Sequence, residues 1–307
     1  MSSRSVLTSL AAAFAFPLLA CAKGPSPAQP NPSPASPGGR SDASVSLTYL
    51  GSAGWQVADG AHSLLIDPYF SRIEDEHPIA LPDEAAIARY APAHADAILV
   101  GHSHHDHLLD VPSIAKRTGA TVVGSESTLN VARAAGVPEG RFILVRGGET
   151  FAIGPFSVHP VRGLHGITGG NLTGTIPRDI KLPMTTDEYA VAEVFQYLIR
   201  VEGRTIFVIG TANFIESEVQ GLRPDVAIIA GPADKVPDYS CRLMRALGRP
   251  PIVLANHFDN QWEPLGPKQM DNETERRANL ARFEKEIHAC APNTKVVVPT
   301  HFRPISI

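Results

Sequence analysis

The sequence predicts an α/β fold in which two β-sheets pack together and helices cover them on the outside. Short apolar runs recur along the chain, with lengths typical of buried strands. Strand signals dominate the first stretch, whereas strands and helices alternate later, an order typical of packed layers. The 307 residues are 43% hydrophobic and 19% charged, which excludes a fibrous or wholly disordered protein.

The first strands are expected at Val45–Leu50 and Ser63–Ile66, with a break from Gly51 to Gly54. Ala97–Val100 is a continuous apolar run, as expected of a strand that is buried on both faces. Further strands are expected at Thr121–Val123, Phe142–Val145, Phe156–Val161, Phe195–Val201, Thr205–Ile209, Val226–Ile229, Ile252–Ala255 and Val296–Val298.

Three helices have recognisable signals. One follows the loop after Ala97–Val100, because Asp110 is a good N-cap, Pro112 suits a first turn and Gly119 can end the helix. A second is expected near Ser127–Ala135. A third begins near Asp271, and its apolar positions share one helix face: Leu280, Phe283, Ile287 and Cys290.

The N-terminal segment predicts export and a lipid anchor. Residues 1–20 read as a signal peptide, because Arg4 precedes an apolar run that is too short to span a membrane and ends in Leu-Leu-Ala before Cys21. Leu-Leu-Ala-Cys resembles the lipobox of bacterial lipoproteins, in which the cysteine is lipidated and becomes the mature N-terminus. The alternative is ordinary cleavage with an incidental cysteine. Lipidation predicts a membrane-anchored protein in the periplasm or on the cell surface.

Residues 21–44 are expected to form the lipidated cysteine and a tether, because Lys23–Asp42 contains six prolines and almost nothing to bury. The folded domain is therefore expected at 45–307. Cys241 and Cys290 would then meet an oxidising compartment, where they can pair, although the sequence leaves open whether they do. The net charge of −4 and the expected export argue against a nucleic-acid partner.

Histidines are concentrated in one loop. Seven of the twelve lie in residues 94–165, and four fall within the segment Gly101–His107, which reads GHSHHDH. This segment follows a predicted strand, where functional groups are often displayed. His102 and His104, two residues apart, can point the same way, while Asp106 and His107 can reach a second position. Four ligands on six residues suit two neighbouring cations; the alternative is a solvated histidine-rich loop.

The pattern His-x-His-x-Asp-His after a buried strand resembles the metallo-β-lactamase superfamily, and Leu50–Trp55 and Leu65–Pro68 resemble its opening strands. The resemblance covers nearly all of Val45–Ile307. It implies a four-layer αββα sandwich with metal at the edge between its sheets. It also implies one or two zinc ions, the first held by His102, His104 and His165 and the second by Asp106, His107 and His257.

One ligand of the family pattern is missing. Members with two metals usually carry a bridging aspartate after a strand, and here Thr211 occupies its place in Gly210-Thr211-Ala212-Asn213. A neutral hydroxyl is a poor substitute for a carboxylate that offsets the repulsion of two cations. Asn213 can approach but is also neutral. The second metal is therefore expected to bind weakly or to be absent.

Other polar residues are expected beside the ligands. Thr211, Asp259 and His301 form this set: Asp259 can orient the imidazole of His257, and His301 follows a late strand that can line the site. His105 is expected to point away, as a supporting or surface group, and Asp67 to support neighbouring loops. His62, His77, His94 and His288 are expected to be solvated, and His159 to be packed or hydrogen-bonded.

The resemblance implies a metallo-hydrolase, in which a metal-bound hydroxide attacks an ester, lactone, amide or phosphodiester. Asp106 is the catalytic candidate, which orients the nucleophile, accepts its proton or ligates the second metal. The alternative is a membrane-anchored metal-binding module with little or no turnover. The cysteine ligand and extra histidines of dedicated β-lactamases are absent, which argues against antibiotic cleavage.

The closer resemblance is to ascorbate-phosphate lactonase-like and phospholipase D-like members, which implies a small-molecule or lipid-like substrate. It rests on His257-Phe258-Asp259 and on the opening strands. The segment Thr175–Thr186, with Arg178 and Lys181, follows His165 and can cover the cleft or steer an anionic substrate. A solvated loop is the alternative.

Overall fold

The computed structural model describes residues 44–73, 79–167, 173–266 and 273–307, without the side chains of 273–275. The chain divides into Met1–Gly39 and Arg40–Ile307, and every described residue belongs to the second unit. The predicted signal peptide, Cys21 and the tether lie outside the described residues, as does Asp271. No helix among the described residues is long and apolar enough to cross a membrane.

Two sheets, each of seven strands within the described residues, form the centre of the second unit. The first sheet contains, in spatial order, β14 (Pro304–Ser306), β1 (Ser46–Gly51), β2 (Gly54–Ala58), β3 (Ser63–Ile66), β4 (Ala97–Leu99), β5 (Thr121–Gly124) and β6 (Phe142–Leu144). The second contains β13 (Lys295–Val297), β12 (Ile252–Asn256), β11 (Val226–Ala230), β10 (Arg204–Ile209), β9 (Phe195–Val201), β8 (Phe156–Arg162) and β7 (Phe151–Ile153).

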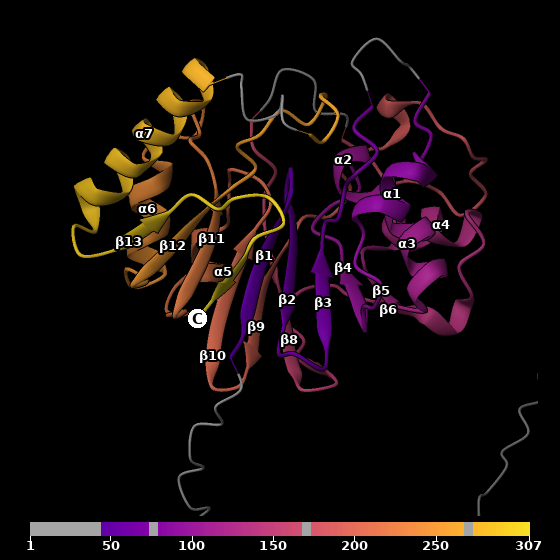
Figure 1. The fold of residues 1–307 in the computed structure, drawn as a ribbon, viewed down its shortest axis with the longest axis horizontal. Helices are drawn as coiled ribbons and strands as arrows, with labels where there is room; N and C mark the ends of the chain where they lie inside the picture. Colours follow the sequence, from indigo (N-terminus) through magenta and orange to yellow (C-terminus); the bar gives the residue numbers. More distant parts are fainter. Residues whose placement is uncertain (1–43, 74–78, 168–172, 267–272) are drawn as a thin grey trace, which may run out of the picture. The chain divides into compact units, whose positions relative to one another are not determined.

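Helices cover the outer face of each sheet (Figure 1). Those beside the first sheet are α1 (Glu84–Tyr90), α2 (His105–Leu108), α3 (Val111–Thr118) and α4 (Glu126–Ala134). Those beside the second are α5 (Glu216–Val219), α6 (Tyr239–Ala246) and α7 (Glu273–Cys290). The described domain is thus the expected αββα sandwich.

The apolar runs are continuous because both faces of these strands are buried. In β4, Ala97 and Leu99 face the core between the sheets, whereas Ile98 packs under α1 and α3. In β11, Val226 and Ile228 face the other sheet, whereas Ala227 and Ile229 pack against α6 and α7. Because successive side chains point to opposite faces, a strand between two layers must be apolar at every position.

The N-terminus of α3 differs from the expectation in one detail. Asp110 is the N-cap residue and Gly119 ends the helix in the left-handed conformation (φ 73°), but the Asp110 side chain makes no capping hydrogen bond. Its carboxylate instead accepts hydrogen bonds from the backbone N–H groups of Phe70 (2.5 Å) and Ser71 (2.9 Å) and from the Ser71 hydroxyl. Asp110 therefore fixes the loop after β3 to the start of α3.

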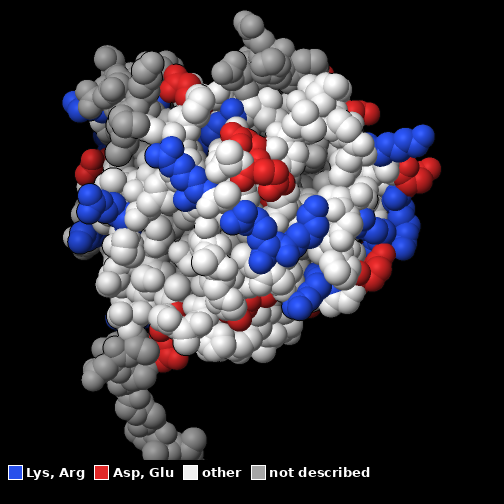
Figure 2. All heavy atoms as spheres, turned by 45° about the vertical axis from the view of Figure 1, so that its right-hand side comes forward, with Lys and Arg blue, Asp and Glu red and all other residues white. Residues whose placement is uncertain are grey.

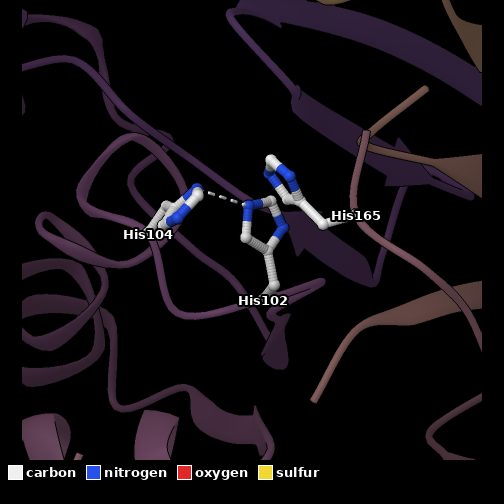
Figure 3. A group of neighbouring side chains, drawn as sticks. All are labelled: His102, His104 and His165. Atoms are coloured by element: carbon white, nitrogen blue, oxygen red, sulfur yellow. Dashed lines mark hydrogen bonds between the residues drawn. The ribbon is translucent and has the colours of Figure 1, made fainter. Parts of the chain in front are cut away.

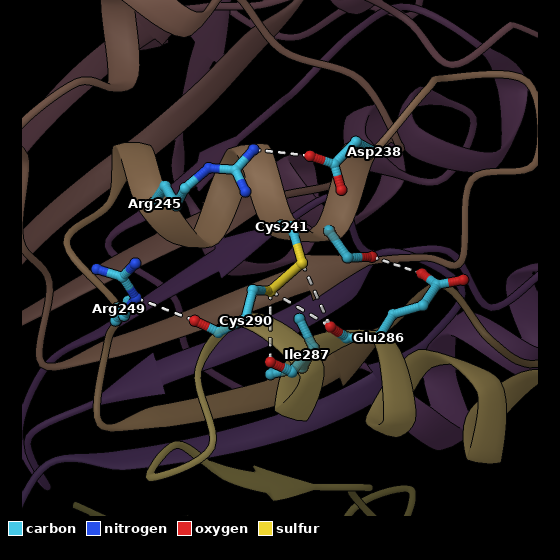
Figure 4. The surroundings of a disulfide bond; sticks show 8 residues. Asp238, Cys241, Arg245, Arg249, Glu286, Ile287 and Cys290 are labelled. Atoms are coloured by element: carbon cyan, nitrogen blue, oxygen red, sulfur yellow. Dashed lines mark hydrogen bonds and ion pairs between the residues drawn. A yellow bond between two sulfur atoms is a disulfide. The ribbon is translucent and has the colours of Figure 1, made fainter.

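Cys241 of α6 and Cys290 of α7 form a disulfide with a Cα–Cα distance of 5.5 Å (Figure 4). The Ser240 hydroxyl donates to the Glu286 carboxylate (2.7 Å) beside it, so a second contact joins the same two helices. The pairing that the sequence left open is therefore present, and it ties the outer helices together.

Candidate metal centre

The histidine loop takes its position from β4. This strand pairs with β3 and β5 in parallel, and the chain leaves the sheet after Leu99. His104 is the N-cap of α2, and the N–H groups of His107 and Leu108 donate to its carbonyl. The extended residues before His104 and the helical turn after it thus direct their side chains to two adjacent positions.

The first position is formed by His102, His104 and His165, whose nearest ligand atoms all lie within 4.8 Å of one another. Figure 3 shows the three rings turned towards one another, with His165 reaching in from a separate segment of the chain. Nε2 of His102 lies 3.2 Å from Nδ1 of His104. Nδ1 of His165 donates to the Gly166 carbonyl (2.8 Å), which leaves its Nε2 free of a proton and able to bind metal.

Burial keeps these three imidazoles neutral. It lowers the pKa of His102, His104 and His165, and the neighbouring histidines lower it further. The pKa of His104 falls to about 3. A metal-binding imidazole must be unprotonated, so the protonation state of this cluster fits that of a ligand set at neutral pH.

The second position is formed by Asp106, His107 and His257, whose ligand atoms also lie within 4.8 Å of one another. Oδ2 of Asp106 is 3.1 Å from Nε2 of His257 and 3.3 Å from Nε2 of His107. Burial lowers the pKa of His107, but the charges of Asp106 and Asp67 outweigh it and raise the value to about 10. The imidazole of His107 therefore holds a positive charge between the carboxylates of Asp106 and Asp67. A metal ion can supply that positive charge instead.

Asp67 supports His107 from behind. Its Oδ2 lies 2.9 Å from Nδ1 of His107, and its Oδ1 accepts a hydrogen bond from the Gly101 N–H (2.6 Å). This arrangement directs Nε2 of the imidazole towards Asp106 and His257, as carboxylates do behind metal-binding histidines. A Cβ at Gly101 or Gly210 would lie 2.8 Å from Oδ2 of Asp67, so both approaches require glycine.

Asn256 holds the second position together from the end of β12. Its Oδ1 accepts from Nε1 of Trp55 (2.9 Å) and from the N–H of His257 (2.9 Å), and its Nδ2 donates to the Ile209 carbonyl (3.0 Å). This fully buried amide therefore joins both sheets directly behind His257. The sequence analysis missed it, although a polar residue at the end of an apolar strand and before a ligand was the available signal.

Asp259 does not orient His257 as expected. Its carboxylate accepts hydrogen bonds from Tyr49 Oη (3.0 Å), Ser52 N–H (2.8 Å), Arg72 Nη2 (2.9 Å) and His301 Nε2 (3.0 Å). His301 thus binds Asp259 and is absent from the described cavity lining, so the structure supports neither the suggested contact of Asp259 with the His257 ring nor the suggested place of His301 in the lining. Burial raises the pKa of Asp259, but Arg72 and the hydrogen bond from His301 outweigh it and lower the pKa.

Thr211 and Asn213 both hold the loop that carries His165. The Thr211 hydroxyl accepts from the Gly166 N–H (2.9 Å). Nδ2 of Asn213 donates to the His165 carbonyl (3.1 Å), and its Oδ1 accepts from the Phe214 N–H (2.9 Å). Asn213 is thus engaged by backbone groups and is absent from the described cavity lining, whereas Thr211 also lines the cavity.

A cavity of about 510 Å³ opens over both clusters. It is lined by His104 and His165 of the first cluster and by all three members of the second. His105 also lines it and is 7% exposed, so of the two places expected for it the surface position is excluded, while that of a supporting group beside the ligands remains. Its ring packs on Trp262 (5.1 Å between centroids) because the first turn of α2 points it back towards the cavity wall.

Of the described segment Thr175–Thr186, the cavity lining includes Thr186, at its end. Thr186, Asp187 and Tyr189 are lining residues, whereas Arg178 is exposed and pairs with Glu139 (3.3 Å). On the face that Figure 2 draws, basic and acidic side chains are interspersed. The expected steering of an anionic substrate by Arg178 therefore finds no support.

The remaining histidines lie away from the clusters. His94 is exposed and His62 is half-buried, both beside Asp96. His288 is also half-buried, with its Nε2 near the Thr294 carbonyl (3.1 Å). Nδ1 of His159 lies within hydrogen-bonding distance of the Glu149 carbonyl (2.8 Å), so this histidine is hydrogen-bonded as expected. His77 lies outside the described residues.

Known proteins resemble this chain in sequence or in fold. A metal-dependent hydrolase from Heliobacterium modesticaldum is 24% identical over 271 residues, which cover 84% of this chain and 99% of that protein. A metal-dependent hydrolase from Pyrobaculum islandicum is 33% identical over 134 residues, so this chain matches 56% of its length. A metallo hydrolase of known structure from Ignicoccus hospitalis has a TM-score of 0.57 at 17% identity, and the match covers 86% of this chain and 98% of that one.

The family described as the beta-lactamase superfamily domain matches residues 62–235, which include the histidine loop and His165. This range is more than half of the 307 residues. Together with the sandwich of two sheets, it shows that the chain belongs to the metallo-β-lactamase superfamily.

Proposed function

We propose that the chain is a metal-dependent hydrolase that cleaves an ester, lactone or phosphodiester at the two clusters. The observation that carries this proposal is the convergence of two three-residue ligand sets on one cavity. Five imidazoles and one carboxylate form a donor set that suits zinc. The curated relatives from Heliobacterium and Pyrobaculum support the reaction class, since both are named metal-dependent hydrolases.

A zinc ion bound by neutral imidazoles lowers the pKa of a water molecule towards about 7 and polarises the substrate oxygen. The chain itself supplies orientation and proton transfer. Asp106 lines the cavity with its carboxylate fixed by His107 and His257, so it is positioned to orient the attacking water and accept its proton. Asp67 and the Gly166 carbonyl fix the rings of His107 and His165 and so keep the ligand set in place.

We propose that the two positions differ in affinity, with the stronger at His102, His104 and His165. At the second, the hydroxyl of Thr211 stands where a carboxylate would offset the repulsion of two cations. This hydroxyl already accepts a hydrogen bond from Gly166. Thr211→Asp is therefore expected to raise the metal content from about one towards two per chain. Two metals retained by the wild type after dialysis would contradict this reading of Thr211.

The experiment that tests the function combines metal counting by mass spectrometry with assays on generic substrates. His104→Ala is expected to remove most of the bound metal, whereas His94→Ala, at an exposed histidine outside both clusters, is expected to retain it. Hydrolysis of a 4-nitrophenyl ester, a lactone or bis(4-nitrophenyl) phosphate should follow the metal content. Full metal content without turnover of any of these would favour the alternative, a metal-binding module.

We also propose that the protein is exported and anchored to a bacterial membrane through lipid on Cys21. The disulfide Cys241–Cys290 supports export, because disulfides persist in oxidising compartments. Several acyl chains anchor a protein stably, whereas one chain binds only marginally. Cys21→Ser is expected to move the protein from the membrane fraction and to change its mass. An unchanged mass and membrane location would exclude the lipid anchor.

A further inference from the structure

As far as the structure describes it, the wall of the cavity away from the metal-binding positions carries no permanently cationic side chain. Among the described lining residues there is no lysine or arginine, and the acidic ones are Asp106 and Asp187. Asp187 lies in the short helix η2 (Thr186–Glu188), and its side chain is exposed. An anionic group bound beside this wall would lose its hydration without gaining a cationic partner, which is costly.

Two arginines near this part of the chain are already paired with other groups and do not offer a partner to an anionic substrate group. Arg178, in the segment leading to η2, pairs with Glu139. Arg72 is 3% exposed and gives its guanidinium to Asp259 and to the Asn260 carbonyl. Neither residue lines the cavity. Recognition of a phosphate or carboxylate on the substrate usually relies on such a guanidinium.

The same wall offers an apolar surface. Trp262 is half-buried, and its ring packs against His105 at 5.1 Å between centroids with a 37° angle between the planes. The Trp262 N–H donates to Oδ1 of Asn260 (3.0 Å), which fixes the backbone at this point. Tyr189, Ala212 and Pro232 are further lining residues. These residues lie beside the polar side chains of Gln261 and Thr186. Aromatic and apolar surface next to a few placed polar groups is typical of sites for small uncharged molecules.

Within the hydrolase function proposed above, we infer that this centre takes an uncharged carboxylic ester or lactone whose hydrocarbon part lies against Trp262. It discriminates against substrates that carry an anionic group away from the cleaved bond. In the reaction, the oxygen of water forms a bond to the acyl carbon, the bond from that carbon to the alcohol oxygen breaks, and the alcohol leaves with one proton of the water. The acid keeps the other proton or releases it to solvent.

The test measures how fast the metal-loaded full chain hydrolyses two 4-nitrophenyl esters. The acyl groups of the two esters have the same number of carbons. 4-Nitrophenyl hexanoate ends in a methyl group, and mono-4-nitrophenyl adipate ends in a carboxylate. We expect kcat/KM to be about tenfold or more higher for the hexanoate, because the carboxylate lacks a partner and lies near Asp187. Asp187→Lys should reduce this ratio severalfold. Asp179→Lys is the matched control, because Asp179 is exposed in the same segment and does not line the cavity.

A second comparison tests the apolar wall. Trp262→Ala should lower kcat/KM about tenfold for the hexanoate and by a much smaller factor for 4-nitrophenyl acetate, because the short acyl chain of the acetate makes less contact with the ring. Trp262→Phe should keep most of the hexanoate activity, because it keeps an aromatic face. Hydrolysis of 4-nitrophenyl acetate and the metal content of the protein also show that each variant is folded.

The possible failures are distinguishable. Equal or faster hydrolysis of the adipate, preference for bis(4-nitrophenyl) phosphate, or equal losses on acetate and hexanoate in Trp262→Ala would overturn the substrate inference while the hydrolase function stands. Hydrolysis of none of these compounds by metal-loaded protein would overturn the proposed function, and the substrate inference with it.

Discussion

The buried ion pair of Arg72 and Asp259 should be among the most sensitive points of the fold. Nη2 of Arg72 lies 2.9 Å from Oδ2 of Asp259, and both side chains are 0% exposed. Removing one partner of such a pair leaves a buried charge and typically costs about 3–5 kcal/mol. The remaining partners decide where each variant falls in that range.

Asp259→Asn should be the more damaging substitution, at about 4–5 kcal/mol. It leaves the guanidinium of Arg72 with the Asn260 carbonyl (3.1 Å) and also weakens the acceptor for Tyr49 and Ser52. Arg72→Met should cost about 3 kcal/mol, because the carboxylate keeps donors from Tyr49, Ser52 and His301. In the double variant neither charge remains, so we expect a coupling free energy of about 2 kcal/mol.

The assay is guanidinium chloride unfolding of the metal-free full chain with its disulfide intact, read at constant m-value. The matched control is a double-mutant cycle on Arg245 and Asp238, a pair 2.7 Å apart whose side chains are 49% and 55% exposed. Its coupling should be below about 1 kcal/mol because solvent screens it. A coupling at Arg72 and Asp259 no larger than that of the control would refute the reasoning.

Three further predictions address other parts of the molecule. Asp67→Asn should weaken zinc binding at the position of His107 about 10–100-fold, as measured by competition with a chelator. Equal weakening at both metal positions would contradict a role of Asp67 through His107. Replacing Cys241 and Cys290 by serine should lower the free energy of unfolding by about 4 kcal/mol, since the bond closes a sequence separation of 49 residues; an unchanged midpoint would count against it. Burial raises the pKa of Asp110 to about 6, although its hydrogen bonds oppose the shift, so the folded state holds the proton longer than the unfolded state. The resulting stability is present at low pH and lost as pH rises from about 4 to about 6, by about 3 kcal/mol. Asp110→Asn should abolish that slope, and an identical slope in the variant would refute the assignment.

The sequence predicted the interior strands because both faces of each are buried. Ala97–Leu99 and Val226–Ala230 are apolar at every position, which leaves a clear signal. The sequence analysis missed β2, β7 and β14, which are short and in part polar or only half-buried: Gln56 interrupts β2, and β14 begins with Pro304. It also missed α1 and α6. Those elements depend on pairing and packing with distant segments, which a local pattern does not record.

The same distinction applies to the site. His102, His104, Asp106 and His107 lie within six residues, so their chemistry is visible in the sequence, and the structure brings them together with His165 and His257. The supporting contacts are long-range. Arg72 and Asp259 are 187 residues apart in the chain, so nothing in the neighbourhood of either identifies the other. Asp259 is close to His257 in sequence, but the structure does not support the contact that this closeness suggested.

Backbone strain around the second cluster gives these supporting contacts their importance. Ser52, Asp67, Arg72 and His257 all adopt positive φ angles between 43° and 52°, in the left-handed region that non-glycine residues rarely occupy. Each such residue costs about 1–3 kcal/mol, and the surrounding structure must compensate for that cost. The compensation lies in the buried hydrogen bonds of Asp259 to Ser52 and Arg72, of Asp67 to Gly101, and of Asn256 to His257. Because these bonds hold the backbone that carries the ligands, a change in the support should alter metal affinity without touching a ligand side chain.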